Sequence, residues 1–388
     1  MEEIESENAL EHLPALFHGQ APRLTSLAFT AFTCFRGITF LNLRQLHISK
    51  QDMRSIGALR AMLDLLDSVG PRLEDLMMSF IRYGFPLIEA SLTDYANRVH
   101  LPRLRRLTFT SMPFSIAAIL LMFLGIQRSH HEQGFAFTCE AYEEAGGPLV
   151  YQAFSILCST SRGIFLTTGA HQWLRIKLDT DMLVDRCSIT MADEKRASRL
   201  VDFKNGGGNL EDLSVWNSQV ATAEELWIEC SQASTGTSFD GLLRPVLLRA
   251  VNAQAIYLDI DDFAFVEVVS WPSFADIAPT LTELHLKIPE TDMEELKIWW
   301  EMVKDCVELR EEYDRPLERL HIYPTSQSFR DPRALEGQLQ YEDWLTKTQQ
   351  EASRLSCVAF HPVDSWPAMR LPSVCTTPEG SWEWLAWD

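Results

Sequence analysis

A carboxylate and two histidines at matching positions of predicted strands are the residues of this sequence best suited to chemistry. Asp259, His285 and His321 each lie between two leucine or isoleucine residues in a short apolar segment. A carboxylate beside two imidazoles could form an acid–base pair or bind a divalent metal ion. Strands that repeat side by side also bring such residues together without any chemical role, and we favour that interpretation. The sequence therefore predicts no catalytic residue, no metal site and no cofactor.

Two other clusters of metal-ligand residue types are explained by local structure. Asp261 and Asp262 follow an apolar alternation at 256–260, so they fit the outward face and the end of a strand. The segment His130–Glu132 lies in a polar turn without a partner at helical spacing. Motifs of serine hydrolases, zinc proteases and dinucleotide-binding enzymes are absent from the sequence. We therefore expect a protein that is not an enzyme; an α/β enzyme with no recognisable site is the least favoured alternative.

Charge and cysteine content narrow the class of partner. The chain has 388 residues and a formal net charge of -20, which would repel the phosphate backbone of nucleic acids. Its eight cysteines include no Cys-x-x-Cys pair, and its acidic first residues are unlike a signal peptide. The longest apolar run, 116–126, is shorter than the roughly 20 residues that cross a bilayer. We expect a soluble, cytoplasmic or nuclear protein that binds neither nucleic acid nor a membrane.

A short phrase, Leu-x-x-Leu-x-apolar, recurs along the chain and indicates stacked repeats. In five places a proline introduces it, as in Pro22–Phe29, Pro71–Met78 and Pro279–Leu286. Recurrence every few tens of residues is typical of proteins in which each repeat adds one strand. The steps vary, so the repeat is irregular. The central positions of the phrase and of its weaker variants are 27, 46, 76, 107, 213, 226, 258, 284, 320 and 358.

Further strands and helices are predicted between these phrases. The region between positions 107 and 213 could continue the same sheet with degenerate repeats, which we favour, or could form an inserted subdomain. Its strand candidates lie at 135–137, 164–166, 174–178 and 189–191. The clearest helix is predicted to begin at Thr291, because Glu294 three residues later completes a capping box. Apolar periodicity predicts other helices over 56–69, 115–127, 148–160, 240–251 and about 335–353.

Alternating strands and helices without phosphate-binding loops predict an α/β fold with parallel strands. The sheet could be an open horseshoe or doubly wound, and the repeated phrase favours the horseshoe: an irregular leucine-rich-repeat solenoid of parallel strands backed by helices. We expect one solenoid over residues 1–362, with a candidate break at the glycine-rich segment 205–209. The tail 363–388 contains four tryptophans; it could cap the last repeat or offer its aromatic side chains to a partner.

In such a solenoid the leucines of the phrase point into the core, and the residues between them form an outward, concave face. With Leu258 as the central residue of its strand, Asp259 falls in the same row as His285, and Tyr257 in the row before it. The C-terminal half of this face mixes aromatic and charged side chains, as protein interfaces do, whereas the N-terminal half is smaller and less charged. The predicted binding residues are Glu225, Trp227, Tyr257, Asp259, Glu283, His285, Arg319, His321 and Tyr323.

The repeat phrases resemble those of a large group of fungal F-box-like proteins with degenerate leucine-rich repeats. The similar segments include LPALFHGQAPRLTSLAF, PRLEDLMMSF, LPRLRRLTFTS, NLEDLSVWN and PLERLHIYPT, within residues 10–362. Regular leucine-rich repeats also carry an asparagine three positions after the last apolar strand residue; here Ile81 and Met112 are among the residues in its place.

The resemblance implies a function in protein recognition. In that family an N-terminal F-box docks onto the adaptor of a cullin-type ubiquitin ligase, and the repeats select the substrate. No F-box fits before the first repeat at Leu24, so adaptor binding is expected only if an F-box lies upstream of Met1. The implied function is a protein–protein interaction module, the substrate-recognition region of such a receptor. The alternative is a free-standing leucine-rich-repeat scaffold with no role in ubiquitin transfer.

Overall fold

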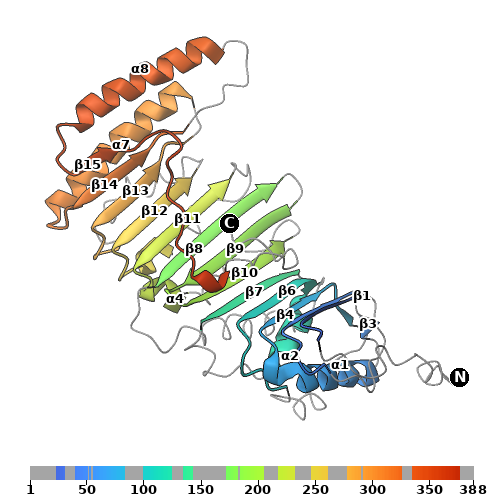
Figure 1. Ribbon diagram of the computed structural model, residues 1–388. Helices are drawn as coiled ribbons and strands as arrows, with labels where there is room; N and C mark the ends of the chain where they lie inside the picture. Colours follow the sequence, from blue (N-terminus) through green and yellow to red (C-terminus); the bar gives the residue numbers. More distant parts are fainter. Residues whose placement is uncertain are drawn as a thin grey trace, which may run out of the picture. The chain divides into compact units, whose positions relative to one another are not determined.

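The protein folds into two compact units, shown in the ribbon diagram of the computed structural model (Figure 1). The first unit combines residues 1–169, 194–203 and 371–388, and the second combines 170–193 and 204–370. The structure describes residues 23–30, 40–50, 52–53, 56–83, 99–124, 134–142, 172–181, 184–204, 217–231, 246–260, 278–289, 292–325 and 334–375.

The first unit is built on an open parallel sheet. The central leucines of the repeat phrase, Leu27, Leu46, Leu76 and Leu107, are paired in register from one strand to the next. Leu46, Leu76 and Leu107 are completely buried, as the alternation predicts. Two further short strands, β3 (Asp52–Met53) and β5 (Arg82–Tyr83), pair separately. The sheet consists of β1 (Ser26–Thr30), β2 (Gln45–Ser49), β4 (Asp75–Ser79), β6 (Arg106–Pro113), β7 (Phe135–Tyr142) and β10 (Arg196–Lys204), in that order.

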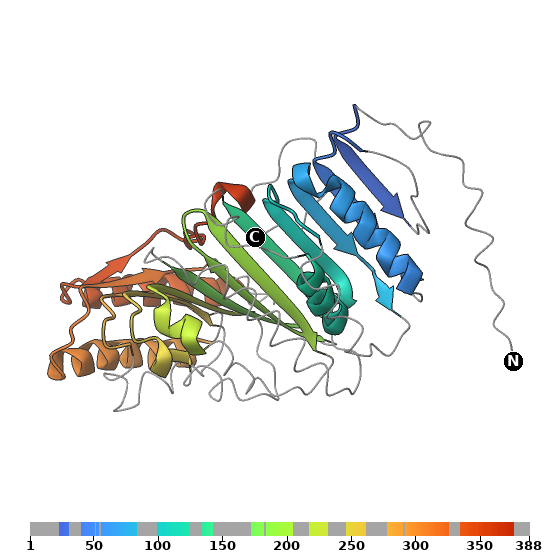
Figure 2. The same cartoon turned by 90° about the horizontal axis from the view of Figure 1, so that it is seen from below.

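Two helices cover one side of this sheet. Helix α1 (Ile56–Val69) has the predicted bounds, 56–69, and buries Leu63, Leu66 and Val69. Helix α2 (Phe114–Phe123) overlaps the predicted 115–127 region and is apolar all round, so it is buried on most of its surface. Figures 1 and 2 show both helices on the same side of the strands. The helix predicted over 148–160 lies outside the described residues.

The second unit also has an open, mostly parallel sheet. Strands β11 to β15 are the predicted repeat strands, whereas β8 and β9 form an antiparallel pair. A repeat that adds one parallel strand at a time predicts no such pair. The strand candidates at 164–166 and around 213 lie outside the described residues. The strands in order are β9 (Val184–Ala192), β8 (Trp173–Asp181), β11 (Glu225–Ser231), β12 (Ala255–Ile260), β13 (Glu283–Lys287), β14 (Arg319–Tyr323) and β15 (Val358–Phe360).

The described helices of the second unit include α4 (Asn217–Thr222), α7 (Met293–Glu312) and α8 (Ala334–Ala352). The predicted helix over about 335–353 is therefore present, and residues 246–249 are the described helical part of 240–251. The N-cap of α7 is Asp292 and not Thr291. The Asp292 carboxylate accepts hydrogen bonds from the backbone N–H groups of Glu294 and Glu295, at 2.9 and 3.0 Å. Both residue types cap helices well, so sequence alone left the start uncertain by one residue.

Three of the five prolines that introduce the phrase stand in tight turns. The N–H groups of Leu73, Leu104 and Leu281 donate to the carbonyl groups three residues earlier, at 3.0–3.3 Å. Pro71, Pro102 and Pro279 therefore occupy the second position of the turn, where a fixed φ near -65° is suitable. The first leucine of these three phrases is thus the corner into the strand, as the sequence predicts, and all three leucines are buried.

The same hydrogen-bond pattern links successive strands in both units. In the first unit, one backbone carbonyl accepts hydrogen bonds from two consecutive N–H groups of the next repeat. The Arg44 carbonyl accepts them from residues 74 and 75, and the Glu74 carbonyl accepts them from residues 105 and 106. In the second unit Gln254 accepts from residues 282 and 283, and Thr282 from residues 318 and 319. These contacts measure 2.7–3.1 Å. The repeat therefore appears in the backbone hydrogen bonds between strands as well as in the sequence.

Strand ends in the first unit repeat too. Lys50, Phe80 and Ser111 each follow the strand core with a left-handed backbone, at φ of 50–52°. Ile81 and Met112, which stand where a regular leucine-rich repeat carries asparagine, are completely buried. Apolar packing therefore takes the place of an asparagine ladder at these two repeats. Both units are α/β, with largely parallel strands and helices packed on the sheet.

Candidate functional site

Four ring-bearing side chains stack across the face of the second sheet. Parallel pairing puts Trp227 opposite Tyr257, Tyr257 opposite His285, and His285 opposite His321. Their ring centroids are 3.7, 4.0 and 4.3 Å apart, with interplanar angles of 3–18°. Strand spacing near 4.8 Å brings planar side chains to stacking distance when each strand contributes one at the same register. We call Trp227, Tyr257, His285 and His321 the aromatic ladder.

The ladder corrects one row of the sequence prediction. Tyr257, not Asp259, shares the row of His285, because Ile256 and not Leu258 is the central residue of β12. An alternating strand fits the phrase equally well after a shift of two residues, so the pattern left this register open. Asp259 lies opposite Glu229 and binds Lys287, with 2.7 Å between Oδ2 and Nζ. The predicted grouping of Asp259 with His285 and His321 is therefore wrong.

Charged side chains line both sides of the ladder as cross-strand ion pairs. Arg319 contacts Glu283 at 2.9 Å, and Arg175 contacts Glu229 at 2.6 Å. The Arg319 side chain is 64% exposed, so its pair contributes little to stability and stays available to a partner. Glu225, the remaining acidic residue of the predicted set, begins β11 and is half-buried.

A segment of the chain's own C-terminal region covers the ladder. Trp366 contacts Trp227, Tyr257 and Tyr323 edge to face, with ring centroids 6.2, 6.3 and 5.1 Å apart. Backbone N–H groups of His361 and Asp364 donate to the carbonyl groups of Ile322 and Pro324 at 2.9 and 3.0 Å. We call residues 361–370 the strap. Figure 2 shows the strap and α7 on opposite sides of the strands of this unit.

Several of the predicted binding residues are not accessible to a partner while the strap is seated. Trp227 is only 3% exposed, and His285 and Tyr323 are each 6% exposed. The half-buried or exposed members of the predicted set are Glu225, Tyr257, Asp259, Glu283, Arg319 and His321. The sequence named the tail tryptophans as candidates for a cap or a partner peptide, but its local pattern carried no signal that Trp366 packs on this face. Residues 376–388 of the tail lie outside the described residues.

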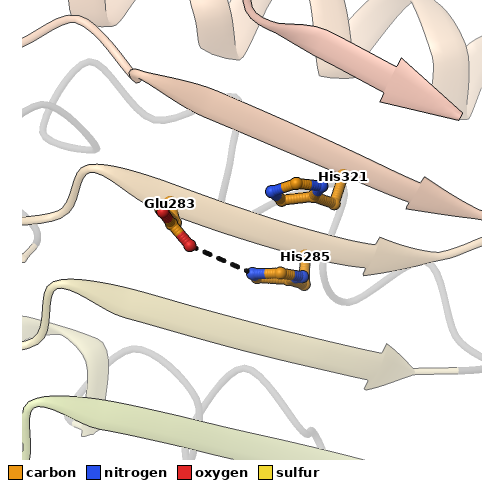
Figure 3. A group of neighbouring side chains, drawn as sticks. All are labelled: Glu283, His285 and His321. Carbon is orange, nitrogen blue, oxygen red and sulfur yellow. Dashed lines mark ion pairs between the residues drawn. The ribbon is translucent and has the colours of Figure 1, made fainter. Parts of the chain in front are cut away.

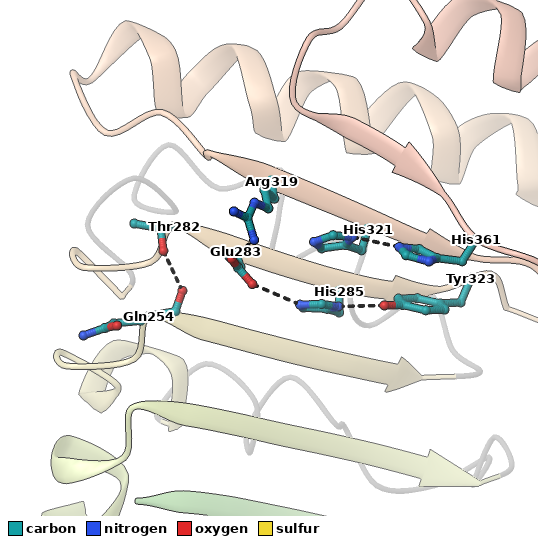
Figure 4. Close-up of polar contacts among 8 residues, drawn as sticks. All are labelled: Gln254, Thr282, Glu283, His285, Arg319, His321, Tyr323 and His361. Carbon is teal, nitrogen blue, oxygen red and sulfur yellow. Dashed lines mark hydrogen bonds and ion pairs between the residues drawn. The ribbon is translucent and has the colours of Figure 1, made fainter. Parts of the chain in front are cut away.

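Histidines and a glutamate gather at one end of the ladder (Figures 3 and 4). His285 Nδ1 lies 3.0 Å from the Tyr323 hydroxyl, and its Nε2 lies 3.7 Å from Glu283 Oε2. His321 Nδ1 lies 2.8 Å from Nε2 of His361, which belongs to the strap. Burial lowers the pKa of His285 to about 3, with His321 and His361 adding to the shift. Burial also lowers the pKa of His321, so both imidazoles are neutral at pH 7.

The first unit contains a separate polar cavity of about 960 Å³. It is lined by residues at and just before the amino ends of β1, β2, β4 and β6, including Arg44, Glu74 and Asp75. Arg106 donates two hydrogen bonds to Asp75, at 2.6 and 2.7 Å. Parallel α/β enzymes bind substrates at the carboxyl ends of strands, so this location does not favour the enzyme hypothesis.

Comparison with protein-family models, with curated proteins and with solved structures found no match for this chain. Within the described part of the chain, every helix is too short or too polar to cross a lipid bilayer. The functional conclusion therefore depends on the geometry of the ladder, the strap and the repeats.

Proposed function

We propose that this protein is a recognition scaffold that binds a partner protein on the ladder face of its second unit. The observation that carries the proposal is the ladder itself: stacked aromatic rings bordered by accessible charged side chains. Protein interfaces favour aromatic and arginine anchors within a polar border. The recurring turns and strand-to-strand hydrogen bonds support an irregular leucine-rich-repeat solenoid as the architecture.

The strap indicates the kind of ligand that the face accepts. It is a non-helical segment whose tryptophan lies against three aromatic rings and whose backbone donates to β14 and to the residue after it. A partner segment with an exposed aromatic side chain would make the same contacts. We therefore propose that the partner binds in an extended conformation and competes with Trp366 for the ladder.

The role in ubiquitin transfer is the more specific part of this proposal. The resemblance to fungal F-box-like proteins makes the bound partner a ligase substrate, and the adaptor would bind to an F-box encoded upstream of Met1. Mapping the 5′ end of the transcript tests this part. An in-frame F-box upstream would support a substrate receptor, whereas a transcript that begins at Met1 would favour a scaffold without a role in ubiquitin transfer.

Partner capture with matched variants tests the binding face. The site variant combines Tyr257→Leu, which keeps an apolar side chain, with Arg319→Glu, which reverses an exposed charge. The control is Lys297→Glu on α7, where Lys297 pairs with Glu294 at the exposed helix surface. Partners on the ladder face should be lost with the site variant and retained with the control. Equal capture by both variants would place the binding site elsewhere.

Trp366→Ala separates two roles of the strap. If the strap competes with the partner, this variant should capture more partner than the wild type, because the ladder is uncovered. If the tail tryptophan is itself the contact offered to the partner, capture should fall instead, and the competition proposed here would be wrong.

A further inference from the structure

Three potential metal ligands converge on one point of the second sheet, independently of any partner. Glu283, His285 and His321 come from the adjacent strands β13 and β14, and their ligand atoms all lie within 4.8 Å of one another. Figure 3 shows the Glu283 carboxylate and one nitrogen of each imidazole on the same side of the strands. Residues i and i+2 of one strand face the same way, and the neighbouring strand supplies the third group at the same level.

Each imidazole is held at its other nitrogen. Tyr323 lies at His285 Nδ1 and His361 lies at His321 Nδ1, so the Nε2 atoms remain on the side of Glu283 (Figure 4). Arg319 holds Glu283 Oε1, which leaves Oε2 toward His285. Histidines that bind metals usually donate their second ring N–H to an outer partner, which fixes the tautomer and the ring orientation.

One atom of this cluster is buried without a hydrogen-bond partner in the part of the chain that the structure describes. It is His285 Nε2, and the His285 ring as a whole is 6% exposed. A buried polar atom without a partner is costly and calls for an explanation.

We propose that Glu283, His285 and His321 form a binding site for a divalent first-row transition metal ion, with Zn²⁺ the first candidate. Two imidazole nitrogens and one carboxylate oxygen match the ligands of zinc, whereas Mg²⁺ and Ca²⁺ prefer oxygen alone. Zinc–ligand distances of about 2.0–2.1 Å require ligand atoms roughly 3.4 Å apart in a tetrahedron. The cluster therefore contracts slightly around the ion, and the half-buried Glu283 side chain is the group that moves. The fourth position is open to water.

Zinc binding to the full chain, purified without a polyhistidine tag, tests the site directly. Titration calorimetry with ZnCl₂ should give one strong site per chain, and Co²⁺ should give the visible absorption of a tetrahedral complex. His285→Ala and His321→Ala should abolish this site. Tyr323→Phe, which removes only the outer hydroxyl, should weaken affinity about 10–100-fold. The control is His47→Ala on β2 in the first unit, which should leave zinc binding unchanged.

If a histidine variant does not fold, Glu283→Gln still tests the proposed metal site. Glu283→Gln keeps the size of a half-buried side chain, and circular dichroism of the metal-free protein checks that the variant folds. It should weaken zinc affinity at least about 10-fold through loss of the anionic ligand. Absence of a stoichiometric zinc site in the wild type, or wild-type affinity in folded Glu283→Gln, His285→Ala and His321→Ala proteins, would overturn the proposal.

Discussion

Replacing Trp366 with alanine should destabilise the second unit by roughly 2–4 kcal/mol. A tryptophan side chain buries about 200 Å² when enclosed, and most of Trp366 is covered. About 150 Å² at about 25 cal/mol per Å² corresponds to roughly 4 kcal/mol, and the edge-to-face contacts add about 1 kcal/mol. The buried indole N–H offsets part of this gain: it has no hydrogen-bond partner among the described residues, which costs roughly 1–3 kcal/mol.

Urea and thermal unfolding measure the loss of global stability, and hydrogen exchange measures the local release of the strap. A loss of roughly 2–4 kcal/mol lowers the melting temperature of a unit of this size by roughly 4–16 °C. The amides of His361 and Asp364, which bond to β14 and the residue after it, should lose exchange protection. Trp366→Phe is the matched control: it keeps the aromatic contact and removes the unpaired N–H, so its loss should stay below about 1 kcal/mol.

A wild-type melting temperature in Trp366→Ala, with unchanged exchange at His361 and Asp364, would refute this reasoning. It would mean that the strap is not seated on the ladder in solution. The ladder face would then be uncovered in the free protein, and competition with a partner would not arise.

Three further predictions concern other parts of the chain. Asp292→Ala removes the N-cap of α7 and should lower stability by about 1 kcal/mol in urea unfolding. Gly70→Ala places a methyl group 2.5 Å from the His100 carbonyl oxygen, which is backbone and cannot rotate away, so the melting temperature should fall. Burial lowers the pKa of His47, so the unfolded chain binds more protons below pH 6.5. Stability should therefore fall as the pH drops from 6.5 toward the folded-state pKa, and His47→Gln should flatten this slope in melts across pH.

Much of the fold could be predicted because the repeat phrase couples turn, corner and buried strand in a few residues. Strands centred on Leu46, Leu76, Leu284 and Leu320 are all present. The register of β12 could not be fixed, because its apolar alternation fits the phrase at either Ile256 or Leu258. The antiparallel β8–β9 pair was missed for a different reason: strand direction depends on the connection and leaves no trace in alternation.

The candidate site was predicted in part for the same physical reason. Rows of outward residues follow from strand periodicity, so Trp227, His285 and His321 could be named from sequence. Which carboxylate joins the histidines depended on register, and Glu283 takes the place expected for Asp259. The seating of Trp366 depends on contacts with Trp227, Tyr257 and Tyr323, which are distant in sequence, and a local pattern does not contain such contacts.

His361 connects the proposed metal site to the strap and predicts that the two are coupled. Its backbone N–H anchors the strap to Ile322, and its ring contacts His321 Nδ1 at 2.8 Å. A metal ion on His321 Nε2 strengthens the Nδ1–H donor and therefore favours the seated strap. Coupling is reciprocal, so Trp366→Ala should weaken zinc affinity by the factor by which zinc stabilises the seated strap. A coupling of about 1 kcal/mol corresponds to roughly fivefold. Zinc that binds without slowing exchange at His361 and Asp364, and with unchanged affinity in Trp366→Ala, would show that the ladder face opens independently of the metal.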